Sequence, residues 1–269
     1  MTSQETSSQA AISIVIPAKN EAESLGRMLP QLRDLYPNAQ ILVVDDGSTD
    51  DTVSVCERCG VAVVSHPYSM GNGAAVKTGA RAATGSILVF MDGDGQHDPD
   101  DIPRLLEVID SGIDLAVGAR NRDSQASFGR WIANTLYNRL ASHLVGHRVD
   151  DLTSGFRAVR ADKFREFIHL LPNGFSYPTT STMAFFRAGY PVSYIPIVAA
   201  KRDGKSHISP IKDGVRFLLI IFKVATLYSP LKLFFPLSMI FFFTGIAYYL
   251  YTFFSTERFT NMGVLLFMT

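Results

Sequence analysis

Short apolar runs alternate with helical patterns along the first part of the chain. The apolar runs predict strands at residues 12–16, 41–44, 61–64, 87–91 and 115–117. Apolar residues recur at helical spacing over residues 25–32, 49–59, 74–83 and 102–109, with Asn20 as the expected N-cap of the first helix. Buried strands joined by helices are typical of a mostly parallel sheet with right-handed crossovers. We therefore predict an α/β domain.

The alternation becomes less regular after residue 119. Helical periodicity continues over residues 131–144 and 163–171, and residues 156–159 and 192–197 indicate two further strands. We expect the globular domain to cover residues 11–210. Residues 1–10 are polar and contain no apolar signal-peptide segment, which predicts a short disordered tail.

The last part of the chain is strongly apolar. Residues 233–254 carry no charge, and 22 residues at a helical rise of about 1.5 Å span about 33 Å, which is enough for a bilayer core. We predict a transmembrane helix over residues 231–254. A second apolar run covers residues 262–269, which we interpret as the start of a second transmembrane helix in a truncated chain.

A basic, amphipathic helix is predicted over residues 211–229, just before the apolar segment. Lys212, Arg216 and Lys223 share one face among mostly apolar neighbours. Such a helix can lie in the lipid headgroup plane, and the alternative is a basic helix packed on the globular domain. Residues 201–232 contain seven bases and two acids, so the positive-inside rule predicts that the globular domain lies on the cytoplasmic face.

Composition narrows the function classes. The chain has 269 residues, 47% of them hydrophobic, and its 25 basic and 25 acidic residues give zero formal net charge. This balance argues against a nucleic-acid binder. Cys56 and Cys59 form a single C-x-x-C in a predicted helix, which disfavours a redox or zinc role and makes a reducing compartment the default.

Carboxylates follow the strand predicted over residues 87–91. The segment 87–99 reads ILVFMDGDGQHDP, so Asp92 and Asp94 lie at a strand's carboxyl end. Two acids with the amide of Gln96 form an oxygen donor set suited to Mg²⁺ or Mn²⁺, which commonly take further oxygens from substrate phosphates. The alternative is a strand-to-helix loop in which Asp98 caps the next helix behind Pro99.

Polar residues also follow the first two strands, at residues 17–21 and 45–50. Because parallel strands end at one edge of a sheet, these loops and the acidic segment are expected to form one cleft. A G-x-G at Gly71 and Gly73 lacks the third glycine of a dinucleotide fingerprint, so we interpret it as a turn and helix start. The chain has no Walker A lysine motif either, which disfavours a P-loop NTPase.

Five motifs in this order resemble one family. They are VVDDGSTDDT (43–52), DGDGQHDP (92–99), GAR (118–120), DLTSGFR (151–157) and RDGKSH (202–207). Together with the two predicted helices that follow, they are similar to the polyprenyl-phosphate glycosyltransferases of glycosyltransferase family 2. The resemblance implies a Rossmann-like GT-A catalytic domain with a mostly parallel sheet, an amphipathic interfacial helix and a C-terminal transmembrane helix.

The resemblance also implies site residues on the donor side. The positions that match those holding the donor's base and ribose are Pro17, Ala18, Glu21 and Asp46. The positions that match the Mg²⁺ or Mn²⁺ site are Asp92, Asp94 and Gln96. For Glu21 the alternative is a first-turn acid favoured by the helix dipole.

Further residues match the acceptor side of that family. Arg120 and Arg130 match residues that engage phosphate groups, including that of the lipid. Asp151, Ser154 and Gly155 match an acceptor-side motif, in which we expect Asp151 to position other groups or only to hold the turn. Arg202 and Ser206 match a loop that closes on the diphosphate, where His207 replaces a frequent lysine.

Residues 167–202 contain neither Asp nor Glu, so this segment offers no carboxylate base for a hydroxyl acceptor. A phosphate acceptor needs no base, because its second pKa of about 6 leaves it largely anionic at pH 7. The resemblance implies transfer of a hexose from a GDP-mannose or UDP-glucose type donor to dolichyl or undecaprenyl phosphate, with inversion at the anomeric carbon, and the absence of acids in this segment agrees with that expectation.

Other functions remain open at this point. A polysaccharide synthase of the same fold, a soluble sugar-1-phosphate nucleotidyltransferase, and a membrane-tethered nucleotide-sugar binder or inactive subunit each explain part of the pattern. The residues also leave open whether copies of the chain form a homo-oligomer through their membrane helices.

Overall fold

The computed structural model describes residues 11–120, 128–174, 176–198, 219, 222, 223, 226 and 230–256, and the side chains of one helix only from residue 134 onward. The chain divides into two units, residues 1–221 and 222–269, and each is described by itself. The expected tail over residues 1–10, most of the amphipathic helix over residues 211–229, and residues 262–269 lie outside the described part.

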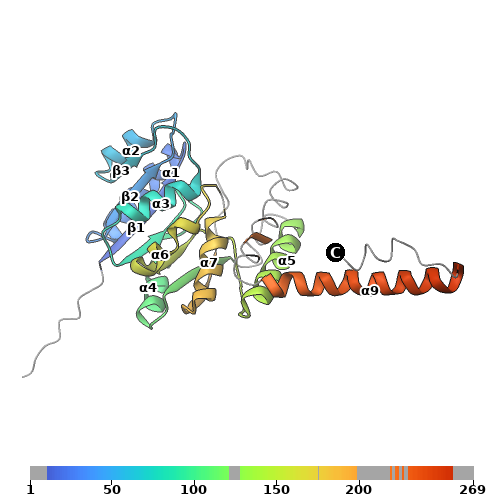
Figure 1. Cartoon of the computed structure of the whole chain (residues 1–269). Helices are drawn as coiled ribbons and strands as arrows, with labels where there is room; N and C mark the ends of the chain where they lie inside the picture. Colours follow the sequence, from blue (N-terminus) through green and yellow to red (C-terminus); the bar gives the residue numbers. More distant parts are fainter. Residues whose placement is uncertain are drawn as a thin grey trace, which may run out of the picture. The chain divides into compact units, whose positions relative to one another are not determined.

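The first unit contains a seven-stranded sheet in the order β3-β2-β1-β4-β6-β5-β7 (Figure 1). The strands are β1 Ile12–Ala18, β2 Gln40–Asp45, β3 Ala62–Ser65, β4 Ile87–Phe90, β5 Leu115–Arg120, β6 Arg157–Arg160 and β7 Val192–Ile197. All seven lie where the apolar runs predict strands, within a few residues. The prediction of a mostly parallel α/β sheet is confirmed.

Strand β6 runs antiparallel to both of its neighbours, β4 and β5. The pairings β1–β2, β1–β4, β2–β3 and β5–β7 are parallel. The amino end of β6 therefore lies at the edge where β4 and β5 end, and Arg157 pairs with Phe90 in the register. Residues that precede β6 come to the same edge as residues that follow β4 and β5.

Helices cover both faces of the sheet: α1 Ala22–Leu35, α2 Thr52–Arg58 and α4 Ile102–Asp110 pack on one face, and α3 Asn72–Ala82, α6 Ala161–Glu166 and α7 Tyr177–Ala188 pack on the other. Helix α5 Phe128–Val145 lies next to α7, and η1 Pro99–Asp101 and η3 Ile168–Leu170 are short 3-10 turns. The apolar pattern did not predict α7, because its first turns read YPTTST and yet are buried. Tyr177 and Phe185 anchor α7 in the apolar core.

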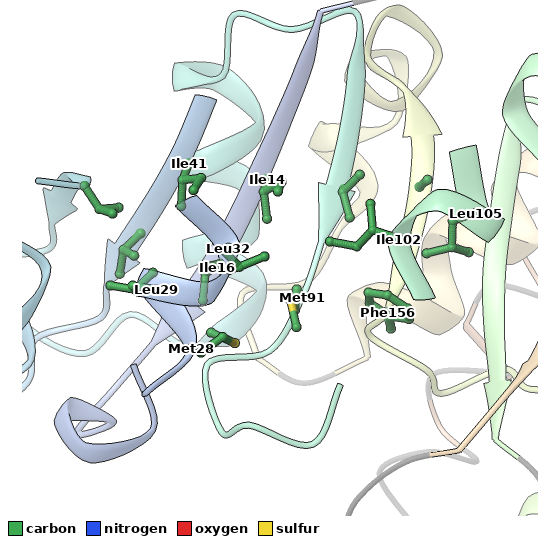
Figure 2. Packing of buried hydrophobic residues seen from close by; sticks show 14 of the residues in the cluster. Ile14, Ile16, Met28, Leu29, Leu32, Ile41, Met91, Ile102, Leu105 and Phe156 are labelled. Atoms are coloured by element: carbon green, nitrogen blue, oxygen red, sulfur yellow. The ribbon is translucent and has the colours of Figure 1, made fainter. Parts of the chain in front are cut away.

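Successive side chains of the central strands enter two separate cores. Ile14 and Ile16 of β1 pack in one core with apolar residues of α1 and α4, some of which Figure 2 shows. Val15 of β1 packs in the other core with residues of α3, α6 and α7. Burial on both sides explains why the strands are continuous apolar runs rather than alternating ones.

Three local features can be compared with the structure, and the first of them, the Asp98 cap, was the alternative interpretation of the acidic segment. Asp98 accepts a hydrogen bond from the Asp100 N–H at 3.0 Å and so caps η1. Gly71, with a φ of 102°, immediately precedes α3 as the predicted turn and helix start. The predicted Asn20 cap is wrong: α1 begins at Ala22, and the Asn20 side chain instead accepts from the Thr49 N–H at 2.8 Å.

The second unit contains helix α9, Pro230–Thr256. Within it, Pro230–Ser255 has a mean hydropathy of 1.8 and is long and apolar enough to cross a membrane. This helix agrees with the one predicted over residues 231–254. Length and composition are the only evidence that it crosses a bilayer, so the crossing itself stays a prediction.

Candidate active site

The loops after β1 and β2 are joined by hydrogen bonds at the carboxyl edge of the sheet. The Asp46 N–H donates to the Ala18 carbonyl at 2.9 Å, and the Glu21 N–H donates to Thr52 Oγ1 at 3.0 Å. Of the residues predicted to hold the nucleotide, Pro17, Ala18, Glu21 and Asp46 therefore lie in one connected region. Whether they contact a nucleotide stays a prediction.

Asp46 is buried, and its carboxylate holds the loop of residues 66–71 through four hydrogen bonds. Its Oδ1 accepts from His66 Nδ1 at 2.8 Å and from the Met70 N–H at 2.7 Å. Its Oδ2 accepts from Ser69 Oγ at 2.8 Å and from the Gly71 N–H at 2.9 Å. Burial alone would raise the pKa of Asp46, but these hydrogen bonds outweigh it and lower that pKa.

His66 is a residue of this region that the motifs did not indicate. Because the ionised Asp46 carboxylate only accepts, the Nδ1 of His66 carries the proton. The Nε2 forms a hydrogen bond with Thr78 Oγ1 at 2.9 Å. The ring thus connects the loop after β2 to helix α3.

The loop after β4, residues 91–98, brings Asp92, Asp94 and Gln96 together, and we call it the acidic loop. The Gln96 N–H donates to Asp94 Oδ1 at 3.2 Å, which closes a tight turn at Gly95. Among the described residues, no three His, Cys, Asp or Glu side chains converge as a complete metal centre. Two acids that rely on substrate phosphates for further oxygens are nevertheless a common Mg²⁺ arrangement.

Gly155 leaves room for the Asp92 carboxylate. A Cβ at this position would lie 2.7 Å from Asp92 Oδ2 and 3.1 Å from Oδ1. The absence of a side chain at residue 155 thus creates the space that the carboxylate occupies. The carboxylate oxygens of Asp92 and Asp94 are donors of the kind that a divalent cation takes.

His97 supports the acidic loop and was not predicted as a functional residue. The Asp92 N–H donates to its Nδ1 at 3.3 Å, and its ring stacks on Phe156 with 5.0 Å between centroids. Burial lowers the pKa of His97 to about 4, although the nearby Asp94 charge opposes the shift. The imidazole is therefore neutral at pH 7 and available as an acceptor.

Arg120, at the end of β5, forms a two-pronged ion pair with Asp151. Its Nε donates to Asp151 Oδ2 at 2.8 Å and its Nη2 donates to Oδ1 at 3.1 Å. Burial alone would raise the pKa of Asp151, but the Arg120 charge and hydrogen bonds lower it. The two hydrogen bonds fix the plane of the Arg120 guanidinium. Burial alone would lower the pKa of Arg120, but the charge and hydrogen bond of Asp151, and the charge of Asp92, raise it.

The remaining predicted residues fall outside the described side chains. The backbone of Arg130 belongs to α5, but its side chain is not described. Arg202 and Ser206 also lie outside the described residues. Their roles stay predictions, as do those of the residues above.

Comparisons with known proteins identify the class. The family model "Glycosyl transferase family 2" matches residues 13–168, and a model described as "GtrB C-terminal hairpin" matches residues 229–269. The fold and these matches define a glycosyltransferase with the GT-A fold. The chain belongs to glycosyl transferase family 2.

Relatives of known name agree with this assignment. The undecaprenyl-phosphate mannosyltransferase of Micrococcus luteus is 33% identical over 72% of this chain and 86% of its own length. The polyprenol monophosphomannose synthase of Mycolicibacterium smegmatis is 29% identical over 79% of this chain and 84% of its own. The resemblance to family 2 that the motifs suggested is confirmed.

A solved structure shows the same fold. Glucosyl-3-phosphoglycerate synthase from Mycobacterium tuberculosis, in complex with Mn²⁺ and UDP-glucose, superposes with a TM-score of 0.66. The match covers 81% of this chain and 79% of that chain at 23% identity. At this level of identity the similarity shows a shared fold and says nothing about the roles of individual residues.

Proposed function

We propose that this chain transfers a hexose from a nucleotide sugar of GDP-mannose or UDP-glucose type to a polyprenyl phosphate, with inversion at the anomeric carbon. One observation carries the proposal. Because β6 is antiparallel, residues 151–155 come to the sheet edge where β4 ends, and Gly155 lies next to Asp92. Asp151 holds Arg120 at the same edge. The acids proposed to bind a metal and an arginine proposed to bind a phosphate therefore share one edge of the sheet. The names of the two relatives above support the same acceptor class.

On the donor side, the loops after β1 and β2 would hold the nucleotide. Backbone hydrogen bonds connect these two loops, which contain Pro17, Ala18, Glu21 and Asp46. Since both carboxylate oxygens of Asp46 already accept hydrogen bonds, its main contribution is to shape the loop of residues 66–71. That loop would then form one wall of the nucleotide site.

Asp92, Asp94 and Gln96 would hold a divalent cation, Mg²⁺ or Mn²⁺. When bound, such a cation neutralises charge on the departing nucleoside diphosphate. The complex of the M. tuberculosis synthase with Mn²⁺ and UDP-glucose supports the choice of ion. The role of the two carboxylates would be to fix the cation at this end of the acidic loop, so that the donor diphosphate is held there through the cation.

On the acceptor side, Arg120, Arg130 and Arg202 are the arginines that would contact phosphate groups. A guanidinium group binds phosphate through paired N–H donors. Asp151 holds the guanidinium group of Arg120 in place. An acceptor phosphate oxygen would form a bond to C1 of the sugar while the bond from C1 to the diphosphate oxygen breaks. The nucleophile is already an anion, so no proton has to be removed, in agreement with the absence of acids in residues 167–202.

Membrane attachment suits a lipid acceptor. Helix α9 is long and apolar enough to cross a bilayer, and the preceding basic segment would face the anionic headgroups of the cytoplasmic leaflet. The polyprenyl phosphate would then reach the enzyme from the membrane, and the nucleotide sugar would reach it from the cytoplasm.

A donor screen tests this function. Detergent-purified full chain is incubated with polyprenyl phosphate, Mn²⁺ or Mg²⁺, and radiolabelled GDP-mannose, UDP-glucose or UDP-GlcNAc. We expect one donor to label the organic phase and EDTA to abolish the labelling. Binding of a nucleotide sugar without any lipid labelling would instead favour the tethered binding protein or inactive subunit.

A further inference from the structure

Arg157 is a fully buried cation at the amino end of β6. Its Nη1 donates to Ser181 Oγ at 2.8 Å and to the Pro178 carbonyl at 3.2 Å, and its Nη2 donates to the Ser154 carbonyl. Its guanidinium carbon lies 5.6 Å from the centre of the Tyr177 ring. All of these partners are uncharged.

Within the described part of the chain, no carboxylate pairs directly with Arg157. An unpaired buried charge is costly, and burial accordingly lowers the pKa of Arg157. Tyr177, Tyr194, Asp151 and Asp92 oppose that shift. Arg157 is therefore held in place by uncharged hydrogen-bond partners rather than by an ion pair of its own.

Residues 151–155 form a short segment before β6, which we call the 151–155 loop. The hydrogen bonds of Arg157 help to hold this loop in place. Arg157 holds the carbonyl of Ser154, and the hydroxyl of Tyr177 donates to the carbonyl of Gly155 at 3.0 Å. The loop is also held at Leu152, whose N–H donates to Asn138 Oδ1 at 3.1 Å. Several independent elements thus fix one short segment.

The position of this segment matters because of Gly155. Its Cα borders the Asp92 carboxylate so closely that a Cβ would lie 2.7 Å from Asp92 Oδ2. A shift of the loop toward β4 would therefore reduce the space that this carboxylate occupies. Arg157 and Tyr177 prevent such a shift by holding the carbonyls of Ser154 and Gly155.

We propose that Arg157 is a positioning residue for the reaction, which holds the 151–155 loop against Asp92 through its hydrogen bond to the Ser154 carbonyl. This role rests on the proposed metal site at Asp92. It predicts that changes at Arg157 act on metal affinity and turnover, although Arg157 itself is buried away from solvent.

Strand β6 offers a matched control. Arg160 lies at the opposite end of the same strand, paired with Ile87 in the register, where it forms an ion pair with Asp114 at 3.3 Å. Arg160→Met removes a guanidinium from the same strand without touching the 151–155 loop. Any effect of losing an arginine from β6 in general would appear in this variant as well.

The test compares Arg157→Met, Arg157→Lys and Arg160→Met with the wild-type full chain in detergent. Three quantities are measured: the melting temperature, the Mn²⁺ concentration that gives half-maximal transfer, and Mn²⁺ binding in the presence of GDP or UDP by electron paramagnetic resonance. The resonance measurement reports on the metal site even if no lipid product forms. It therefore separates failure of this role from failure of the proposed function.

For Arg157→Met we expect a weaker Mn²⁺ site and a lower kcat, each by about 10–100-fold, the range found when a supporting residue of a metal ligand is removed. Arg157→Lys keeps the charge but cannot reach the Ser154 and Pro178 carbonyls together, so its loss should be intermediate. Arg160→Met should keep Mn²⁺ binding and transfer within about twofold of wild type, as surface changes usually do.

Wild-type Mn²⁺ binding and kcat in Arg157→Met would overturn the proposal. If Arg157→Met does not fold, Arg157→Lys decides: a weakened Mn²⁺ site supports the positioning role and an unchanged site overturns it. Tyr177→Phe adds an independent check, because it removes only the hydroxyl that holds the Gly155 carbonyl. We expect it to weaken Mn²⁺ binding in the same direction as Arg157→Lys.

Discussion

The two halves of the sheet edge are built in different ways. In the half formed by β1 and β2, the polar residues follow their own strands, and hydrogen bonds join neighbouring loops, as between Asp46 and Ala18. In the half formed by β4, β5 and β6, the acidic loop after β4 lies against a segment more than fifty residues later, residues 151–155. The first half is local in sequence, whereas the second depends on the reversal of one strand.

This difference locates the sensitive part of the site. Asp46 accepts hydrogen bonds from four donors of a single loop, so the loss of one donor leaves three others in place. The second half instead combines Arg120, Asp151 and Arg157 from different elements around one glycine. We therefore expect substitutions in the second half to have larger effects than those in the first.

The largest effect is expected for Asp94→Asn. If Asp94 holds the cation as proposed, its replacement by an amide should lower kcat for sugar transfer by about 1,000-fold, since a single well-placed electrostatic group commonly contributes about 100- to 1,000-fold. The matched control is Asp100→Asn, in the exposed first turn of η1. Radiolabel transfer measures both, and near-normal transfer by Asp94→Asn would contradict the metal role.

Asp151→Asn should be the most destabilising change in this set. It leaves the partly buried guanidinium of Arg120 without its partner, and the loss should be about 3 kcal/mol, the low end of values for broken buried pairs. Urea unfolding of the full chain in detergent, followed by circular dichroism, gives the free energy of unfolding. An unchanged value would mean that the ion pair does not hold the 151–155 loop.

The same variant has a characteristic pH dependence. The pKa of Asp151 is lower in the folded chain than its ordinary value, so the ionised carboxylate stabilises the fold above a pH of about 4. As the pH falls below about 4, the unfolded chain takes up a proton on Asp151 first, and the stabilisation decreases until the pH has passed the lowered pKa of the folded chain. The difference in unfolding free energy between wild type and Asp151→Asn should therefore shrink in acid, and a constant difference from about pH 7 to about pH 3 would contradict this assignment.

Asp46→Asn should have a smaller effect on stability, with a specific effect on the donor. An amide oxygen replaces only one of the two accepting oxygens, so one or two buried donors lose their partner, at a cost of about 1–3 kcal/mol. Because the loop of residues 66–71 would loosen, we expect a higher KM for the nucleotide sugar with little change in the KM for the lipid. Equal increases in both would contradict a role confined to the donor side.

The smallest effect is expected for Asp98→Ala. Loss of the hydrogen bond to the Asp100 N–H should destabilise the fold by about 1 kcal/mol, as is typical of an N-cap. Since Asp98 acts as a cap, transfer should stay within about twofold of wild type under stabilising conditions. A loss as large as that of Asp94→Asn would show that Asp98 belongs to the metal site.

Much of the fold could be predicted from the sequence, for a physical reason. The central strands β1, β2 and β4 are buried on both faces and are continuously apolar apart from a few residues, which made them easy to recognise; the other four strands also lie within a few residues of their predicted positions. Helix α7 could not be predicted in this way, because Thr179–Thr182 are polar although buried, and their burial depends on contacts such as that of Ser181 with Arg157. The Asn20 cap failed because a tertiary bond to Thr49 took its side chain.

The candidate site was only partly predictable. Asp92, Asp94 and Gln96 could be singled out because their chemistry and spacing are local in sequence. The antiparallel direction of β6 is a tertiary property, so the contact between Gly155 and Asp92 and the buried position of Arg157 were not predicted. His66 and His97 were missed for the same reason, since their partners Asp46 and the Asp92 N–H are fixed only by the folded loops.

The most direct test of the central claim is an acceptor comparison with the full chain in detergent. With the donor found active in the screen, labelled sugar transfer is measured to polyprenyl phosphate, to the unphosphorylated polyprenol and to 3-phosphoglycerate, the acceptor type suggested by the name of the M. tuberculosis synthase. We predict labelled product from polyprenyl phosphate alone, with inverted configuration at C1. Transfer to polyprenol, or a preference for 3-phosphoglycerate, would contradict the account of a lipid phosphate positioned by Arg120 and Asp151.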